Sequence, residues 1–406
     1  MVQKRKLPVR HLMVLVAMCS LGMAGLGIFY KVQGIFFVPM AEELGCGRGA
    51  VSVMLTIVSL TGAATGMVVN RLLDRWPLRA VILLGATMCV VPTGLNSLCH
   101  SLPPLYVLSA VCGVGVGIIS SVLLTTVIGR WFVEGRSLAT GIVFGSTGIA
   151  GAVFSPVVSA IIEGRGWRVG YLVSAALIAA FCLPAVVLPI TLSPEEAGLA
   201  PLGGKASAAG RTAHEAHTVP GALPLALVLS FLCMFVNPIT HHFPGLADSL
   251  GLPASVGALM ISSCMVVNSF GKVALGAMSD RFSPLASLEV DLGLTLLGVL
   301  GLLLVPTEPM VYVSSGLVGA NFAFVTVGLA TVVLGVFGEE RYGEVYPLVN
   351  LAGAIGSALG ATLIGVFYDV SGDYRLAFVV LSTMLAACML IVAYLLGRPK
   401  EETFQK

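Results

Sequence analysis

Runs of about 20 mostly apolar residues recur along the chain, and short polar segments separate them. A run of this length is typical of a helix that crosses a lipid bilayer, because each helical residue rises by about 1.5 Å. The pattern predicts twelve membrane-spanning helices, with bounds near 10–38, 50–70, 78–98, 103–128, 137–160, 169–190, 222–246, 254–276, 284–306, 310–334, 343–368 and 374–397.

The composition supports a membrane protein. The 406 residues are 57% hydrophobic and only 10% charged, whereas a soluble domain carries about 25% charged residues. In lipid the backbone must satisfy its own hydrogen bonds, which favours helices over open strands. The first apolar run is too long for a cleavable signal peptide, so we expect it to remain as a span. We therefore expect an all-α membrane protein.

Positive charges lie unevenly on the two sides of the predicted helices. The termini and the even-numbered loops hold sixteen lysines and arginines, whereas the opposite side holds only four. Cytoplasmic loops carry the excess of such residues, so both termini are expected in the cytoplasm. The remaining two, Lys31 and Lys272, fall within predicted spans. The net charge of +2 gives no indication of a nucleic-acid partner.

A polar segment divides the predicted spans into two sets of six. Residues 191–221 are rich in glycine, alanine and proline and show no apolar periodicity, which is typical of a flexible linker. The sequence therefore predicts an N-terminal half at 1–190, a cytoplasmic linker at 191–221 and a C-terminal half at 222–406.

The two halves carry the same short motif after their second predicted span. Asp74-Arg75 precedes Trp76 in the first half, and Asp280-Arg281 precedes Phe282 in the second. Such an aspartate can hold helix N-termini and arginines through contacts that break when the halves rock. The alternative is an ordinary charge cluster at a helix end, but its repetition at matching places favours two pseudo-symmetric halves.

This organisation resembles the major facilitator superfamily over almost the whole chain. The family motif Gly-x-x-x-Asp-Arg is present as 276–281, GAMSDR, whereas the first copy has Asn70 where glycine is usual. The resemblance implies a twelve-helix transporter that works by alternating access. Gly276, Asp280 and Arg281, together with Asp74 and Arg75, would then belong to the conformational motif.

Finer similarities indicate one branch of that family. Residues 129–148, GRWFVEGRSLATGIVFGSTG, resemble monocarboxylate transporters and their bacterial relatives, which include oxalate/formate exchangers. Residues 39–52, PMAEELGCGRGAVS, resemble them too. Lys31 stands five residues before Phe36-Phe37, a spacing shared with animal monocarboxylate transporters.

The two lysines inside predicted spans are the strongest site candidates, because burying a charge in the membrane is costly. Lys31 lies about two-thirds of the way through the first span, and Lys272 lies eight residues, or about 12 Å along a helix, before Asp280. The alternative for each is that its ammonium group reaches the interface along its flexible stem.

The resemblance gives Lys272 a specific role. Related transporters carry a substrate-binding arginine at this point and often an aspartate one turn earlier, where this chain has Lys272 and Asn268. A lysine offers a point charge rather than a planar fork, which weakens bidentate carboxylate binding. Asparagine cannot carry the proton that an aspartate would.

Further candidates for substrate binding are His241, His242 and Tyr30. Neighbouring helical positions point about 100° apart, so at most one of the two histidines should face a central cavity. Imidazole titrates near neutral pH and donates hydrogen bonds, which suits a proton relay or a carboxylate contact. The alternative is a histidine at the interface or one bonded to a backbone carbonyl. Tyr30, Asn237, Asn321 and Asn350 are candidates to line a cavity, although such residues more often join helices to one another.

Acidic residues give these lysines no obvious partner. Glu289 and Asp291 fall in the first two turns of the ninth predicted span, where we expect them to meet loop arginines. A cavity that both lysines face would then be positively charged when empty, and a small anion would be its counter-ion.

These observations predict a secondary transporter for a small organic anion rather than an enzyme. A proton-coupled monocarboxylate such as lactate, pyruvate or formate is the first candidate, and exchange of small dicarboxylates of the oxalate/formate type is the alternative. Export of a drug or metabolite is a third. We expect a monomer in a bacterial inner membrane, with no cofactor, metal or nucleic-acid partner. The sequence contains no Walker motif.

Overall fold

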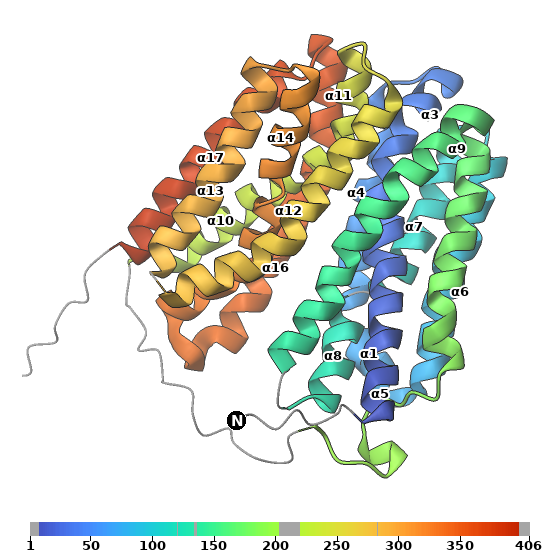
Figure 1. Ribbon diagram of the computed structural model, residues 1–406, viewed down its shortest axis with the longest axis vertical. Coiled ribbons are helices and arrows are strands. Elements are labelled where there is room, and N and C mark those ends of the chain that lie inside the picture. Colours follow the sequence, from blue (N-terminus) through green and yellow to red (C-terminus); the bar gives the residue numbers. More distant parts are fainter. Residues whose placement is uncertain (1–7, 120, 134–135, 203–219, 282, 398–406) are drawn as a thin grey trace, which may run out of the picture. The chain divides into compact units, whose positions relative to one another are not determined.

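The computed structural model describes residues 8–119, 121–133, 136–202, 220–281 and 283–397, and a few side chains within these ranges are left out. The chain divides into two compact units, Met1–Ala209 and Gly210–Lys406, which we call the N-terminal and C-terminal units. Figure 1 colours the first from blue to green and the second from yellow to red.

The N-terminal unit consists of helices joined by short turns. Its first span begins with α1 (Val9–Gly22) and continues through a π-helix, η1 (Met23–Phe29), a single turn, α2 (Tyr30–Val32), a 3-10 helix, η2 (Gln33–Phe36), and α3 (Phe37–Leu44). The other elements are α4 (Arg48–Gly66), α5 (Val69–Arg75), α6 (Leu78–Leu95), η3 (Asn96–Leu98), α7 (Leu102–Ile119), α8 (Ser121–Trp131), α9 (Arg136–Val187) and η4 (Glu195–Ala197).

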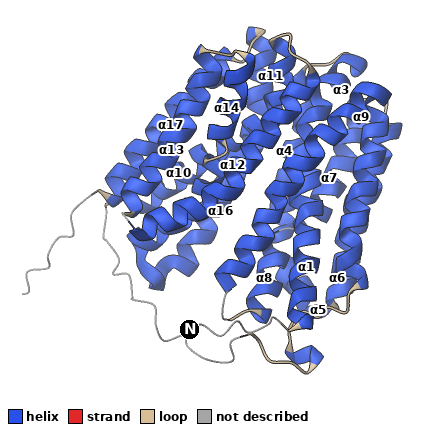
Figure 2. Ribbon diagram, viewed as in Figure 1, coloured by secondary structure: helices blue, strands red, loops and turns tan. Residues whose placement is uncertain are grey.

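The C-terminal unit is built in the same way. Its elements are α10 (Ala222–Val236), η5 (Asn237–His242), α11 (Phe243–Ser249), α12 (Ala254–Arg281), α13 (Pro284–Leu304), α14 (Glu308–Val318), α15 (Asn321–Ala323), η6 (Phe324–Gly328), α16 (Leu329–Ser371) and α17 (Arg375–Leu396). Figure 2 shows helices and loops throughout the described residues.

Length and apolar composition identify eleven membrane-spanning stretches among the described residues. The longest, Ala139–Val187, lies within the 52-residue α9. Gly166 interrupts α9 with the non-helical angles φ 82° and ψ 163°, so this stretch contains two spans. The expected all-α membrane fold with twelve spans is thereby confirmed.

Several spans depart from α-helical geometry near their middle. The first span contains η1, whose sequence MAGLGIF offers two glycines, followed directly by η2. The first span of the C-terminal unit contains the 3-10 helix η5 between Asn237 and His242, where Pro238 removes a backbone donor. The span that contains α14 includes the π-helix η6. Such local departures are rare in helices and often mark functional sites.

The two units share an internal repeat that extends beyond the Asp-Arg motif. We call two residues equivalent when they are separated by the same number of positions as Asp74 and Asp280. Gly45 and Gly251 are equivalent, as are Gly166 and Gly372, and all four have positive φ angles. A contact repeats as well, because a Cβ on Gly113 would meet the backbone oxygen of Val58, and one on the equivalent Gly319 would meet that of the equivalent Cys264.

The chain that follows α9 packs against the N-terminal unit. The backbone of Leu202 pairs with that of Trp131 and Val133 at 3.0 and 3.1 Å. The indole Nε1 of Trp131 donates to the backbone oxygen of Thr191 at 3.0 Å. The first part of the predicted linker is therefore attached to this unit, and residues 203–219 lie outside the described part of the chain.

Candidate functional site

The break in the first span sets the positions of Tyr30 and Lys31. Both belong to the single turn α2, which lies between a π-helix and a 3-10 helix. Both side chains are partly buried, and the Tyr30 hydroxyl forms a hydrogen bond with the hydroxyl of Ser59 in α4. The irregular backbone thus places a phenol and an ammonium group within the apolar span Val9–Leu44.

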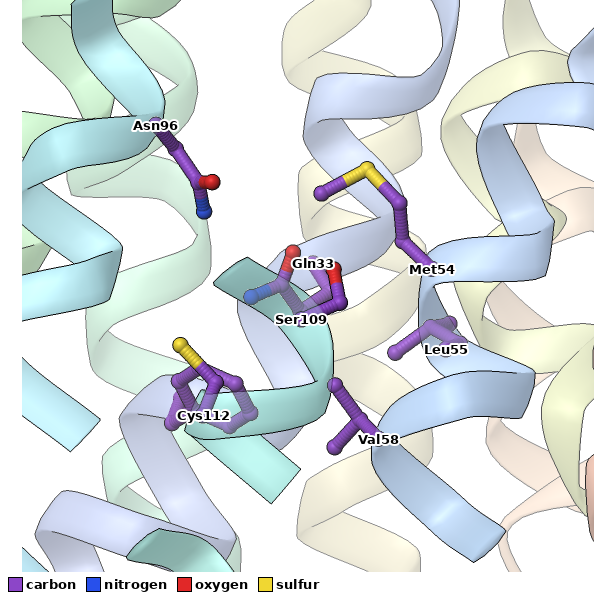
Figure 3. Close-up of a pocket in the computed structure, with 8 residues that line it drawn as sticks. Gln33, Met54, Leu55, Val58, Asn96, Ser109 and Cys112 are labelled. Carbon is purple, nitrogen blue, oxygen red and sulfur yellow. The ribbon is translucent and has the colours of Figure 1, made fainter. Parts of the chain in front are cut away.

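A small pocket lies behind this break in the N-terminal unit. It is narrow, with a volume of only about 10 Å³, and is lined by Phe29, Gln33, Met54, Leu55, Val58, Asn96, Ser109 and Cys112. Figure 3 shows the amides of Gln33 and Asn96 among apolar side chains. The Oδ1 atom of Asn96 is buried without a hydrogen-bond partner among the described residues. The sequence analysis missed Gln33 and Asn96, although polar side chains at membrane depth were the signal that identified the other candidates.

In the C-terminal unit, Asn268 and Lys272 lie one turn apart on the same face of α12. Asn268 is buried, and its Oδ1 atom has no hydrogen-bond partner among the described residues. Lys272 is partly buried, and no ion pair in the described part of the chain includes it. This arrangement leaves one cation and one acceptor oxygen next to each other within a span.

The two histidines lie at the end of the 3-10 helix η5, and both are buried. The Nε2 atom of His242 is 3.1 Å from the backbone oxygen of Ala361, to which it can donate a hydrogen bond. The His242 ring lies 6.0 Å from that of Tyr374. His242 therefore has the backbone contact that was the alternative to a substrate contact, while the role of His241 stays a prediction.

Two asparagines that were candidates for either a cavity or a helix contact join neighbouring helices. The Nδ2 atom of Asn321 donates to Oδ1 of Asn237 at 2.7 Å and to the backbone oxygen of Cys233 at 2.9 Å. These bonds connect α15 to α10 and η5 inside the C-terminal unit. Asn350, in contrast, is exposed on α16.

Asp291 differs from the expectation that it meets loop arginines. It is only 6% exposed and lies on the buried face of α13 with Leu288, Leu292 and Thr295. No ion pair among the described residues involves it, and its Oδ2 atom is buried without a hydrogen-bond partner there. The expectation was wrong because the helix turns Asp291 inward, about 200° away from Glu289.

The conformational motif is described only in part. Asp74 and Arg75 lie at the end of α5, and both are exposed. Gly276, Asp280 and Arg281 belong to the backbone of α12, but their side-chain environments lie outside the described residues. The proposed role of the motif therefore stays a prediction.

Polar residues at four positions of the C-terminal unit share one property. Four of them occupy positions at which the equivalent residue of the N-terminal unit is glycine, and the pairs are Gly62 and Asn268, Gly66 and Lys272, Gly85 and Asp291, and Gly115 and Asn321. Three of these glycines, Gly62, Gly85 and Gly115, pack closely on a neighbouring helix, whereas Gly66 has only Val122 near it. No group of three potential metal ligands occurs among the described residues.

Comparison with known proteins identifies related sequences. The family model described as Major Facilitator Superfamily matches residues 19–361 and 225–406. Mouse monocarboxylate transporter 11 is 27% identical, and the match covers 79% of this chain and 73% of that protein. Bovine monocarboxylate transporter 13 is 28% identical over 87% and 82% of the two chains. The oxalate:formate antiporter of Oxalobacter formigenes is 27% identical over 32% of this chain and 30% of its own.

Solved structures of transporters have the same fold. A nucleoside transporter aligns with a TM-score of 0.72 at 11% identity, covering 95% of this chain and 99% of its own. A peptide transporter aligns with a TM-score of 0.68 at 13% identity, covering 95% and 93%. At these identities the likeness concerns the fold alone.

Proposed function

Because the chain belongs to the major facilitator superfamily, we propose that it is a secondary transporter that carries a small organic anion together with a proton. A monocarboxylate such as lactate, pyruvate or formate is the substrate class that we favour. Its curated relatives include monocarboxylate transporters and an oxalate:formate antiporter. We further propose that it acts as a monomer in a bacterial inner membrane, with both termini in the cytoplasm, as the distribution of positive charge favours.

The observation that carries this proposal is Lys272 on α12. It lies within a span and makes no ion pair with any described residue. A charge in a membrane interior is stabilised by an opposite charge or by a water-filled cavity. A substrate carboxylate supplies that opposite charge, and the neighbouring Asn268 amide donates a hydrogen bond to the same group.

Other predicted residues have secondary roles in this proposal. Lys31 either makes the electrostatic potential at the substrate site more positive or closes the outer gate, since it lies on the irregular turn of the first span. Tyr30 and His241 contribute hydrogen bonds to the substrate. His242 contributes less, because its Nε2 atom already lies 3.1 Å from the backbone oxygen of Ala361.

Alternating access requires helices that change shape near the substrate. The π-helical and 3-10 segments η1, η2, η5 and η6 supply such points, because their backbone hydrogen bonds differ from those of a regular α-helix. Transporters commonly bind substrate where spanning helices are interrupted near the middle of the bilayer. The Asp-Arg motif at 74–75 and 280–281 would then form contacts that break and re-form during each cycle.

Counterflow in proteoliposomes tests the proposal directly. Vesicles loaded with unlabelled lactate, pyruvate, formate or oxalate should take up the same labelled compound. Lys272→Met keeps the length of the side chain but removes its charge, and it should abolish uptake. Lys272→Arg should restore part of it, whereas Asn350→Ala on the exposed face of α16 should behave like the wild type. Normal counterflow by Lys272→Met would rule out this site.

Anion exchange is a second candidate, and one residue favours it. Asn268 stands where related transporters often have an aspartate, and an amide cannot carry a proton. An obligate exchanger needs a counter-substrate on the far side, whereas a proton-coupled carrier accumulates substrate from a pH gradient alone. Accumulation in vesicles that contain no anion substrate therefore separates the two. If apolar cations raised the Tm of the purified protein and no carboxylate did, the result would instead favour an exporter.

A further inference from the structure

Asp291 lies at a place where a membrane protein rarely has a carboxyl group. It follows the start of α13 by seven residues, which is about 10 Å along the helix axis. Its neighbours on the same face are Leu288, Leu292 and Thr295, and all four are buried. The side chain therefore points into the C-terminal unit, away from lipid and from the helix end.

No basic group of the described residues balances this carboxyl group. The α13 helix packs against α12, α14, α17 and the π-helix η6. Among the described residues, Cys233 of α10 interacts electrostatically with Asp291, and the Sγ atom of Cys388 of α17 is 3.3 Å from that of Cys233. Neither ion pair of the described residues joins Asp291 to Lys272 of the neighbouring α12.

The carboxyl group of Asp291 has fewer hydrogen-bond partners in the described part of the chain than it could accept. The backbone N–H of Phe324, the first residue of η6, interacts with the carboxyl group. The Oδ2 atom of Asp291 is buried without a partner among the described residues. An ionised carboxylate in such surroundings is strongly unfavourable, whereas the protonated acid is neutral and gains a donor.

The π-helix next to Asp291 offers a way to change these surroundings. Gly328 at the end of η6 packs so closely on α13 that an added Cβ would lie 2.8 Å from Leu288 Cδ2. Leu288 and Asp291 are one turn apart on the same face. A shift of η6 toward regular α-helix would therefore alter the contacts on both residues together and can admit water to the carboxyl group.

We propose that Asp291 is the group that binds the transported proton, protonated in the packed arrangement seen here and ionised when η6 moves and water reaches it. The proton enters from water on one side of the membrane and leaves to water on the other, and no other chemical change occurs. This inference rests on the proposed function and names the residue that takes the place of the acid absent at Asn268.

Two transport measurements on the full-length protein test the assignment. Asp291→Asn, an isostere of the protonated acid, should still exchange labelled lactate for unlabelled lactate but should fail to accumulate lactate above equilibrium from a pH gradient. Glu289→Gln removes the other carboxyl group of α13, which is partly exposed, and should keep both activities. Lys272→Met, in contrast, should lose both.

A labelling experiment on the wild type covers the case in which Asp291→Asn does not fold. Hydrophobic carbodiimides react with protonated carboxyl groups in apolar surroundings. Peptide mass spectrometry should therefore find the label on Asp291, with a higher yield at acidic than at alkaline pH and a parallel loss of accumulation.

The outcomes distinguish this inference from the proposed function. A wild type without counterflow of any carboxylate refutes the proposed function itself. Wild-type counterflow together with full pH-driven accumulation by Asp291→Asn refutes only the role of Asp291. Absence of carbodiimide label from Asp291 at every pH, in vesicles that transport lactate, refutes it as well.

Discussion

The same contact between neighbouring helices is built differently in the two units. In the N-terminal unit, Gly85 of α6 packs so closely on α7 that an added Cβ would lie 2.8 Å from Ile118 Cγ2 and 2.6 Å from Ile119 Cγ2. In the C-terminal unit, the equivalent Asp291 interacts with Phe324, the equivalent of Ile118. There the backbone is π-helical, which changes the spacing along the helix and provides room for a side chain.

Two further pairs, Gly62 with Asn268 and Gly115 with Asn321, show the same difference, whereas Gly66, the equivalent of Lys272, is not closely packed. A Cβ on Gly115 would lie 2.6 Å from the backbone nitrogen of Cys89, whereas the equivalent Asn321 forms two hydrogen bonds. Glycine packing brings backbones together and leaves no side chain at those positions. At these positions, therefore, the N-terminal unit has closely packed backbones, while the C-terminal unit has polar side chains.

The largest expected effect is that of Gly85→Asp, which gives the N-terminal unit the carboxyl group that the C-terminal unit has at the equivalent position 291. Gly85→Asp places a carboxyl group where Ile118 and Ile119 leave no space, so it combines overpacking with an unpaired buried acid. Each of these defects costs about 1–5 kcal/mol, which is comparable to the stability of a whole domain. We expect little folded protein in size-exclusion chromatography. A well-folded Gly85→Asp variant would contradict the proposed difference between the units.

The next effect concerns transport rather than folding. Truncating a buried charge that pairs with a ligand costs about 2–5 kcal/mol, so Lys272→Ala should lower the uptake of labelled lactate by at least about 30-fold. The equivalent Gly66→Ala should stay within about twofold of the wild type, because the added Cβ would meet only Val122, at 3.8 Å. Equal losses in the two variants would mean that the difference between the units does not determine transport.

A smaller effect is expected from the hydrogen bonds of Asn321. Asn321→Ala removes its bonds to Asn237 and to the backbone of Cys233, which should lower stability by about 1–3 kcal/mol. The decrease should appear as a lower Tm in a thermal-shift assay on purified protein. Asn350→Ala on the exposed face of α16 serves as the control and should leave the Tm unchanged. An unchanged Tm for both would show that the asparagine bonds add nothing to stability.

The smallest effect should be the same in both units. Gly45 and Gly251 have φ angles of 62° and 70°, and no atom lies within 4 Å of a Cβ added to either one. Alanine at each position should therefore cost only the strain of a left-handed residue, about 1–2 kcal/mol. Thermal unfolding of Gly45→Ala and Gly251→Ala should show similar shifts. Clearly unequal shifts would argue against the equivalence on which the comparison is based.

The sequence by itself determined the number and the type of the helices. An apolar run of about 20 residues in lipid has one stable form, because the backbone must bond to itself. The Asp-Arg motif at 74–75 and 280–281 revealed the repeat for a similar reason, since burying a charge inside a span is costly and most charged residues therefore lie near helix ends. The lysines at 31 and 272 were visible because each interrupts an apolar run.

Only the tertiary structure decided which polar residues face the interior. Glu289 and Asp291 are two positions apart and look alike in sequence, yet packing of α13 against α14, α17 and η6 buries Asp291 and leaves Glu289 partly exposed. The contact between His242 and Ala361 also joins segments far apart in the chain. Local sequence determines whether a helix forms, but the direction that a side chain faces depends on the helices around it, which the apolar pattern of a membrane span does not record.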